Sequence, residues 1–375
     1  MQDFSTKILA ELVSFETVTP NGSDAIAYCA RLLDSWGFSC EMLEFEGVSN
    51  LYAKFGDAKK NICFAGHVDV VPPLVGWTTD PFVLTERNGY LYGRGTNDMK
   101  GPLSACLAAI YEFSKADHPN FSISVLLTSD EEIMGNNGTK RVVEHLKNTK
   151  ENITGCVICE SCSPGNSGEY IKIGCRGSLN VNLTSNGSQC HVANGPIFGN
   201  HITNFLEFLC GLLNVPLDQG SDNFDRTNIE ITSIDVDNEV RNIIPSVALA
   251  KLNVRFNDCW TFDRLEHHIM QSLPSNVTTS FERFGAPFVG AKKQFISFLS
   301  DIITTEIGIC PQVGTSGGNS DAVFIKEITD VVEIGTPISG AHITNECISL
   351  SDLATLRSIY LVILREFGRY RETGS

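Results

Sequence analysis

The segment NICFAGHVDVVPP, residues 61–73, begins as an apolar strand-like run and ends with His67 and Asp69 before two prolines. Alternate residues of a strand face the same side, so the imidazole and the carboxylate are expected to lie together. A metal-bound imidazole needs its second ring nitrogen held in place, and a neighbouring carboxylate commonly holds it. For these two residues alone, the alternative is a structural histidine at the end of a strand.

Three more acids stand near the ends of expected elements. Asp98, in YLYGRGTNDMKGP, precedes an expected helix and could either cap that helix or bridge two cations. The segment lacks the GxxxxGK[ST] order of a phosphate loop. Glu131 and Glu132 follow the apolar run FSISVLLTS. Their side chains should point in different directions, so one can bind metal while the other carries a proton. A solvated loop is the alternative for this pair alone.

Glu160 follows the expected strand GCVIC, and His342 lies in GAHITNE. Two imidazoles and three carboxylates are thus available as ligands, on His67, Asp98, Glu132, Glu160 and His342. Such nitrogen and oxygen donors suit Zn²⁺ and neighbouring first-row metals. Two ions that shared one carboxylate would each receive one histidine and one further acid. The pattern therefore predicts a two-metal centre with a position open for water.

The elements that must position these residues follow an α/β pattern. Helical periodicity over 25–36, 102–114 and 140–147 alternates with strand-like runs at 61–65, 121–129 and 155–159. Strands that alternate with helices indicate a mixed, largely parallel sheet flanked by helices. Ligand sites in such sheets lie at the carboxyl ends of the strands, where the candidate ligands stand.

The pattern changes near residue 174. Residues 178–187 alternate apolar and polar side chains, as an antiparallel strand with one exposed face does. A helix at 202–213 and strands at 228–236 and 247–256 follow, and α/β signals return at about residue 292. We therefore predict a discontinuous catalytic, metal-binding domain, 1–176 and 292–375. We also predict an inserted α+β domain, 177–291, for dimerisation or as a lid.

Composition excludes several classes of protein. A net charge of −16 argues against nucleic acid as a partner, because neutralising phosphates needs a basic face. No apolar stretch reaches the length of a membrane span, and the first 15 residues predict an amphipathic helix rather than a signal peptide. Thirteen cysteines without a secretory signal indicate reduced thiols and a cytoplasmic protein. The C-x2-C-x2-C spacing at 156–162 lacks the fourth cysteine of an iron–sulfur run, so buried structural thiols are favoured.

Taken together, the motifs resemble those of the two-metal aminoacylase and peptidase family, which includes acetylornithine deacetylase, carboxypeptidases and N-succinyl-L,L-diaminopimelate desuccinylase. The markers are GHVDVVPP, WTTDPF, LYGRGTNDMKG, TSDEE, RGSLNVNL, NIIPSVA, RFND, GTSGGNSDAVFI and GAHITNE. The stretches RGSL, RFNDCWT and HITNE are most similar to the desuccinylase branch.

The resemblance implies how the candidate residues are used. His67 and Glu160 would hold one metal, Glu132 and His342 the other, with Asp98 bridging. The expected ions are two Zn²⁺ per chain, with Co²⁺ possible in one site. Two further roles are implied in the hydrolysis of an amide: Asp69 would orient the first histidine, and Glu131 would act as general base.

The resemblance also implies a small anionic N-acyl amino acid as substrate and a homodimer formed through the inserted domain. Carboxylate recognition is expected from Arg176 and Arg255, whose planar guanidinium groups bind carboxylates with two parallel bonds. Further contacts are expected from Asn242, Ser316 and Gly317. For the arginines a surface role is the alternative, and for the glycine loop a tight turn.

His191, in SQCHVANG, would stabilise the oxyanion from the partner subunit; the alternative is an exposed loop histidine. Three departures from the desuccinylase pattern concern the acyl group rather than the metals. They are Ser-Cys-Ser-Pro after Glu160, Val-Ala-Asn-Gly after the loop histidine, and Asn319 in the glycine loop. Another N-acyl amino acid deacylase or a metallo-carboxypeptidase is thus the alternative function. A metal-storing relative is disfavoured because storage needs no base beside Glu132.

Overall fold

The computed structural model describes residues 3–116, 119–133 and 135–371 of the 375-residue chain. Two compact units make up the chain: unit 1 is Met1–Gly174 with Gly290–Ser375, and unit 2 is Cys175–Val289. Arg176, which we had expected in the first domain, therefore belongs to unit 2.

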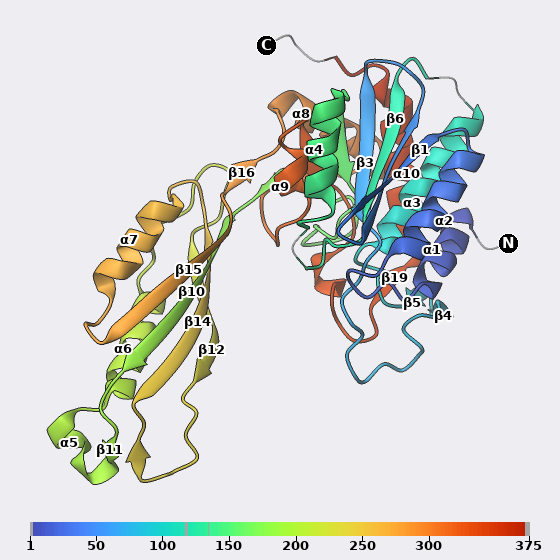
Figure 1. Cartoon of the computed structure of the whole chain (residues 1–375). Coiled ribbons are helices and arrows are strands. Elements are labelled where there is room, and N and C mark those ends of the chain that lie inside the picture. Colours follow the sequence, from blue (N-terminus) through green and yellow to red (C-terminus); the bar gives the residue numbers. More distant parts are fainter. Residues whose placement is uncertain (1–2, 117–118, 134, 372–375) are drawn as a thin grey trace. The chain divides into compact units, whose positions relative to one another are not determined.

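Unit 1 contains an eight-stranded mixed sheet with the strand order β1-β2-β6-β3-β7-β18-β8-β17 (Figure 1). The strands are β1 (Ser39–Phe45), β2 (Val48–Phe55), β3 (Asn61–His67), β6 (Ser122–Thr128), β7 (Gly155–Ile158), β8 (Tyr170–Lys172), β17 (Gln312–Gly314) and β18 (Val331–Glu333). Pairing is parallel between β6 and β3, β3 and β7, β7 and β18, and β8 and β17. Strands β1 and β2 form an antiparallel edge that the sequence pattern did not predict. Every residue of β3 and β6 is buried, as in sheets covered on both faces.

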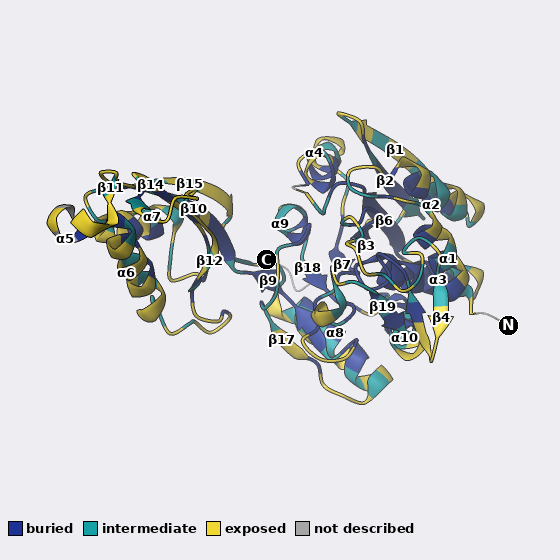
Figure 2. Ribbon diagram, turned by 90° about the horizontal axis from the view of Figure 1, so that it is seen from below, coloured by how far each residue is buried: buried dark blue, intermediate teal, exposed yellow. Residues whose placement is uncertain are grey.

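Helices cover both faces of this sheet. They are α1 (Phe4–Ser14), α2 (Ser23–Ser35), α3 (Lys100–Ala116), α4 (Thr139–Thr149), α8 (Lys293–Ile307), α9 (Ala322–Ile325) and α10 (Leu350–Phe367). Helix α3 packs against α1 and α10, and α4 packs against α9. Figure 2 shows the strands of the sheet buried between these two groups. The order β3-α3-β6-α4-β7 accounts for the parallel strands, and the predicted α/β fold with a largely parallel sheet is confirmed.

Two helices next to the site, α3 and α10, begin where the local sequence favours a helix start. Helix α3 starts two residues after Asp98, and its apolar residues are buried around most of its circumference. Such a helix is stable only inside a packed layer, so its first turn is held firmly. Helix α10 begins with a capping serine, since Ser349 Oγ accepts the N–H of Asp352 at 2.9 Å. A small sheet of β4 (Thr85–Arg87), β5 (Tyr90–Tyr92) and β19 (Cys347–Ser349) precedes that cap.

Unit 2 contains an antiparallel four-stranded sheet in the order β12-β14-β10-β15, with α6 and α7 packed on it. Its elements are β10 (Gly177–Asn186), α6 (His201–Asn214), β12 (Asn228–Asp235), β14 (Val247–Phe256), α7 (Phe262–Ser272) and β15 (Val277–Gly285). Buried and less buried residues alternate along β14, so one face of the sheet lies in the core of unit 2. A short ribbon pairs β11 (Cys190–His191) with β13 (Ile243–Ile244).

Within the described part of the chain, no helix combines the length and the apolar character that crossing a bilayer requires. The cysteines of the C-x2-C-x2-C spacing, Cys156, Cys159 and Cys162, are buried free thiols, and the first of them lies in β7 beside Cys63 of β3.

Candidate metal centre

The carboxyl ends of three neighbouring parallel strands bring most of the candidate ligands together. His67 is the last residue of β3 and pairs in register with Thr128, the last residue of β6. On the other side of β3, Ala65 pairs with Ile158, the last residue of β7. The residues that follow these strand ends, among them Glu160, are therefore delivered to one edge of the sheet.

The ring of His67 is almost fully buried, and its Nε2 atom faces three carboxylates. The distances from Nε2 are 3.3 Å to Asp98 Oδ1, 3.6 Å to Glu160 Oε2 and 3.8 Å to Glu131 Oε2. One imidazole nitrogen thus lies at the centre of an acidic group.

The second histidine completes the cluster from a segment far along the chain. His342 Nε2 lies 3.0 Å from Glu132 Oε2 and 3.4 Å from Asp98 Oδ2. The two carboxylate oxygens of Asp98 therefore face different histidines, with Oδ1 toward His67 and Oδ2 toward His342. This is the placement that a carboxylate bridging two ions requires.

Asp69 is fully buried and contacts the first histidine in two ways. The Nδ1 atom of His67 lies 2.9 Å from the main-chain oxygen of Asp69 and 3.5 Å from its carboxylate. A carbonyl oxygen can only accept, so Nδ1 carries the proton and Nε2 is the nitrogen available to a metal. The carboxylate of Asp69 also accepts the main-chain N–H of Glu132 at 3.2 Å, which ties the two ligand segments together.

The charges of these groups perturb one another strongly. Burial and the neighbouring Asp98 raise the pKa of Glu160 to about 8, and burial raises the pKa of Glu131 well above its usual value. Burial also acts to raise the pKa of Asp98, but hydrogen bonds with His342 and His67 hold it well below its usual value. Hydrogen bonds with Asp98 and Glu132 raise the pKa of His342 to about 10. The cluster without ions therefore keeps protons to limit the repulsion among its carboxylates.

These observations fit divalent cations. Within the described ranges, no lysine or arginine forms an ion pair with Asp69, Asp98, Glu131, Glu132 or Glu160. Ligand atoms of His67, Asp98 and Glu132 all lie within 4.8 Å of one another, so one small ion can reach all three. Nitrogen and oxygen donors of this kind are the ligands of zinc and similar metals.

Sequence analysis missed the residues that hold the Asp98 segment in place. The carboxylate of Glu346 accepts the main-chain N–H groups of Asn97 at 2.8 Å and Asp98 at 2.9 Å, and it pairs with Arg94 at 2.7 Å. Glu346 and Arg94 are each only 1% exposed. The acid at the end of GAHITNE was a visible signal, because a glutamate beside a metal-ligand motif needs a partner when it is buried.

Asp321 is a second residue that sequence analysis missed. It ends the glycine loop, is almost fully buried, and accepts a hydrogen bond from Thr139 Oγ1 at 2.7 Å. Burial raises the pKa of Asp321 to about 7. The pKa of Glu131 is raised mainly by burial, and the charge of Asp321 adds to that increase.

The glycine loop joins β17 to α9 in unit 1. Ser316 donates both its main-chain N–H, at 3.1 Å, and its hydroxyl, at 2.8 Å, to the Tyr170 hydroxyl oxygen. Gly317 has a φ of 96°, a conformation that glycine adopts without strain. Lys172, the last residue of β8, contacts the same loop: its Nζ donates to the carbonyl oxygen of Gly318 at 2.7 Å and pairs with Glu333 at 2.8 Å.

Four of the candidate residues belong to unit 2. Arg176 Nη1 donates to Asn228 Oδ1 at 2.7 Å. The pKa of Arg255 is lowered, mainly by burial and also by the positive charge of the nearby Arg176. Among the described residues neither arginine is in an ion pair, so the two cations are available to an anion. His191 and Asn242 are exposed neighbours in the β11–β13 ribbon, where the carbonyl oxygen of Asn242 accepts the N–H of residue 192.

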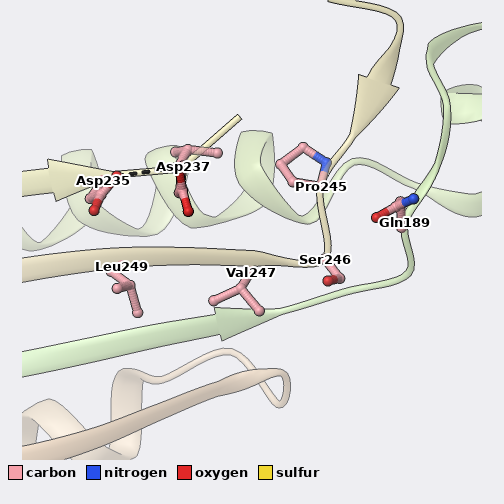
Figure 3. Close-up of a pocket in the computed structure, with 8 residues that line it drawn as sticks. Gln189, Asp235, Asp237, Pro245, Ser246, Val247 and Leu249 are labelled. Carbon is pink, nitrogen blue, oxygen red and sulfur yellow. Dashed lines mark hydrogen bonds between the residues drawn. The ribbon is translucent and has the colours of Figure 1, made fainter. Parts of the chain in front are cut away.

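Unit 2 also has a surface hollow of about 350 Å³ at one end of its sheet (Figure 3). Asp237 donates its N–H to the Asp235 carboxylate beside the hollow at 3.0 Å. The lining consists of Gln189, Asp235, Val236, Asp237, Pro245, Ser246, Val247 and Leu249. None of the candidate metal ligands is among these residues.

Comparison with known proteins identifies relatives that match nearly the whole chain. The chain is 37% identical over 372 residues to the succinyl-diaminopimelate desuccinylase of Pelagibacter ubique, covering 95% of this chain and 97% of the relative. It is 40% identical to the enzyme of the same name from Xanthobacter autotrophicus, covering 97% of this chain and 99% of the relative.

A solved structure has the same fold. It is the M20 family metallo-carboxypeptidase Sso-CP2 from Sulfolobus solfataricus, which aligns with a TM-score of 0.79 at 19% identity over 98% of this chain and 100% of that one. The profile of Peptidase family M20/M25/M40 matches residues 63–366, a range that includes every residue of the metal cluster. The chain belongs to this family of amide-bond hydrolases.

Proposed function

We propose that the protein hydrolyses the amide bond of N-succinyl-L,L-diaminopimelate, giving succinate and L,L-diaminopimelate on the route to lysine and cell-wall precursors. Relatives with the corresponding name match essentially the whole chain, which supports this substrate. The observation that carries the chemistry is the carboxylate of Asp98, because each of its oxygens faces a different histidine within 3.4 Å.

We propose two divalent ions per chain, with zinc as the physiological metal and cobalt as an alternative in one site. His67 and Glu160 would hold one ion, Glu132 and His342 the other, and Asp98 both. When bound, such a pair of ions lowers the pKa of water and polarises a carbonyl group. Four carboxylates including that of Glu131 would balance the four positive charges, which explains how the acids remain ionised in a buried site.

Glu131 is proposed as the general base. Its carboxylate lies 3.8 Å from His67 Nε2, and its side chain is 17% exposed, so it borders the metal ligands while keeping access to solvent. It would take a proton from the attacking water and deliver it to the leaving amine. Asp69 would keep the proton of His67 on Nδ1, through the 2.9 Å contact with its main-chain oxygen.

Substrate carboxylates are proposed to bind Arg176 and Arg255, two neighbouring cations without acidic partners among the described residues. Guanidinium groups bind carboxylates with two parallel hydrogen bonds, which favours a succinyl group over an uncharged acyl group. Asn242, Ser316 and Gly317 would supply further polar contacts.

A homodimer is proposed to form through unit 2. Strand β12 lies at the edge of its sheet, and α6 packs beside it. Apolar side chains there are exposed, including Leu206, Leu213 and Ile234 at 43–48%. An open strand edge next to an apolar helix face is suited to pairing with a second copy. His191, also in unit 2, would then stabilise the oxyanion in the other subunit.

We propose a cytoplasmic location, since six cysteines of unit 1 are buried as thiols, which a reducing compartment preserves.

The test of this function is a set of three parallel assays on protein reconstituted with zinc. Hydrolysis of N-succinyl-L,L-diaminopimelate is followed beside hydrolysis of N-acetylornithine and of a peptide with a free carboxyl terminus. We expect kcat/KM to be about 10–150-fold higher for the succinyl substrate, because a hydrogen bond to a charged group is worth about 1.5–3 kcal/mol. Arg255→Lys, which keeps the charge but loses the planar fork, should reduce that preference. Preference for acetylornithine or the peptide would contradict the assignment.

A further inference from the structure

One buried carboxylate gathers the main chain around the bridging aspartate. Glu346 Oε1 accepts the N–H groups of Asn97 at 2.8 Å and Asp98 at 2.9 Å. Glu346 Oε2 accepts the N–H of Gly95 at 3.0 Å and the Nη1–H of Arg94 at 2.7 Å. Four donors therefore converge on one acid, and three of them are main-chain N–H groups of the loop at residues 95–98.

This contact joins two ligand segments that are distant in the sequence. Glu346 lies four residues after His342, whereas the loop it binds is about 250 residues earlier and carries Asp98. Two further contacts reinforce the link: Thr336 Oγ1 donates to the carbonyl oxygen of Asn97 at 2.7 Å, and the main-chain oxygen of Glu346 accepts the N–H of Gly93 at 3.1 Å. The loop and the segment with the second histidine thus form one hydrogen-bonded assembly.

The geometry of the bridge depends on that assembly. The two carboxylate oxygens of Asp98 lie 3.3 and 3.4 Å from different imidazoles, so a rotation of its main chain would withdraw one oxygen from one side. The N–H of Asp98 itself donates to Glu346, and this bond fixes the peptide plane between Asn97 and Asp98. Arg94, which is 1% exposed, holds the glutamate in turn, and its guanidinium carbon lies 5.3 Å from the centroid of the Trp77 ring.

We propose that Glu346, held by Arg94, is a positioning residue that sets the affinity of the centre for divalent ions by fixing the main chain of Asp98. The inference rests on the proposed function to the extent that a metal pair shares this aspartate. Groups that orient ligands from one contact further out change metal affinity by about 10–100-fold when they are removed. Glu346 differs from such groups in acting through the main chain of the ligand rather than through its side chain.

The experiment compares metal-free wild type with Glu346→Gln, which keeps the length of the side chain but offers only one acceptor oxygen. The amide –NH₂ must then face either the loop N–H groups or Arg94, which are all donors. Zn²⁺ affinity and stoichiometry are measured by competition with a chromogenic chelator on folded protein, and thermal unfolding of the metal-free form is recorded beside them. We expect Zn²⁺ affinity to fall by about 10–100-fold.

Two controls separate positioning from stability. Glu366→Gln changes a surface glutamate paired with Arg369 at 2.6 Å, and it should bind Zn²⁺ as wild type does. Ile303→Ala removes fully buried apolar atoms in α8, so it should lower the unfolding temperature while leaving Zn²⁺ affinity unchanged. If Glu346→Gln does not fold, Arg94→Lys tests the same contact, since the lysine keeps the charge but not the guanidinium geometry.

Wild-type Zn²⁺ affinity in the folded Glu346 variant, or in the Arg94 variant where that one is needed, would overturn the inference while leaving the proposed function intact. If Ile303→Ala lowered Zn²⁺ affinity as much as Glu346→Gln does, the inference would also be overturned, because lost stability alone would then explain both results. Wild-type protein that binds no divalent ion would refute the proposed function and this inference with it.

Discussion

The buried ion pair between Lys172 and Glu333 supports the glycine loop, and breaking it gives a quantitative test of the structure. The lysine is 2% exposed and the glutamate 1%, with Nζ 2.8 Å from Oε2. Each charge also anchors the loop: Nζ donates to the carbonyl oxygen of Gly318 at 2.7 Å, and Ser320 Oγ donates to Glu333 Oε1 at 2.6 Å. The pair therefore connects the ends of β8 and β18 to the loop that is proposed to contact substrate.

Lys172→Met should destabilise unit 1 by about 3–5 kcal/mol, because the carboxylate remains buried without its cation. Glu333→Leu should cost a similar amount for the converse reason. The double variant removes both charges together with the bonds to Gly318 and Ser320, at about 1 kcal/mol each, so it should cost about 2 kcal/mol. The sum of the single effects should exceed the effect of the double variant by several kcal/mol.

The assay is urea unfolding followed by tryptophan fluorescence in a Trp260→Phe background. Of the three tryptophans of the chain, Trp36 and Trp77 then remain, and both belong to unit 1. The signal therefore reports on the unit that contains the pair, even if unit 2 unfolds separately. Additive single effects, or single losses below about 1 kcal/mol, would show that the two side chains are hydrated and unpaired, and would refute the reasoning.

Four further outcomes are expected. Glu131→Gln should retain bound metal by elemental analysis but lose about 10²–10⁴-fold in kcat, and full activity would exclude it as the base. His67→Ala should lose one of two ions per chain, measured by the same analysis; unchanged stoichiometry would contradict the ligand assignment. Burial acts to raise the pKa of Asp218, but hydrogen bonds from Thr227, Gly220 and Asn257 outweigh it and lower the pKa to about 2. Its stabilising effect is present above pH 3.8 and is lost as pH falls toward 2, so Asp218→Asn should cost about 1 kcal/mol at neutral pH and flatten the acid side of the stability curve of unit 2. Protein stripped by a chelator should melt at a lower temperature at pH 8.5 than at pH 5.5, and zinc should reduce that difference; equal melting temperatures at both pH values would contradict the charge balance derived for the cluster.

The strand ends were predictable because parallel pairing has a simple geometric consequence. An apolar run that stops at His67, another that stops before Glu131 and a third that stops before Glu160 must end at one edge if they are neighbours in a parallel sheet. The helix that begins near residue 100 was predictable in the same way, from its periodicity and its proline. Local pattern alone therefore predicts where the acids and the first histidine lie.

The supporting contacts were not predictable from local pattern, since they join segments with no shared periodicity. Glu346 binds main-chain N–H groups of a loop about 250 residues earlier. Since nearly every residue type has such a group, the sequence does not indicate which residues donate to it. Lys172 and Glu333 left a weak signal, because each is a single charge within an apolar strand, in YIKIG and VVEIG. Opposite charges in two such strands indicate a buried pair, but only the structure identifies which strands are neighbours.

The charge balance of the cluster links its assembly to the metals. Without ions, folding brings the carboxylates together in a buried site. The pKa of Glu160 is raised there from its usual 4.5 to about 8 by burial and by the charge of Asp98. Because folding raises the pKa of this acid, the folded protein becomes less stable as pH rises from 4.5 toward 8. Over that range the unfolded chain has already released the proton that the folded protein still holds. His342, with its pKa raised from 6.5 to about 10, stabilises the folded form below pH 6.5 and loses that effect as pH rises toward 10. Both terms therefore destabilise the metal-free protein at high pH, where divalent ions bind best because their ligands are deprotonated. Ions bound as proposed would offset the repulsion that folding creates, so they should contribute to the stability of unit 1 as well as to hydrolysis.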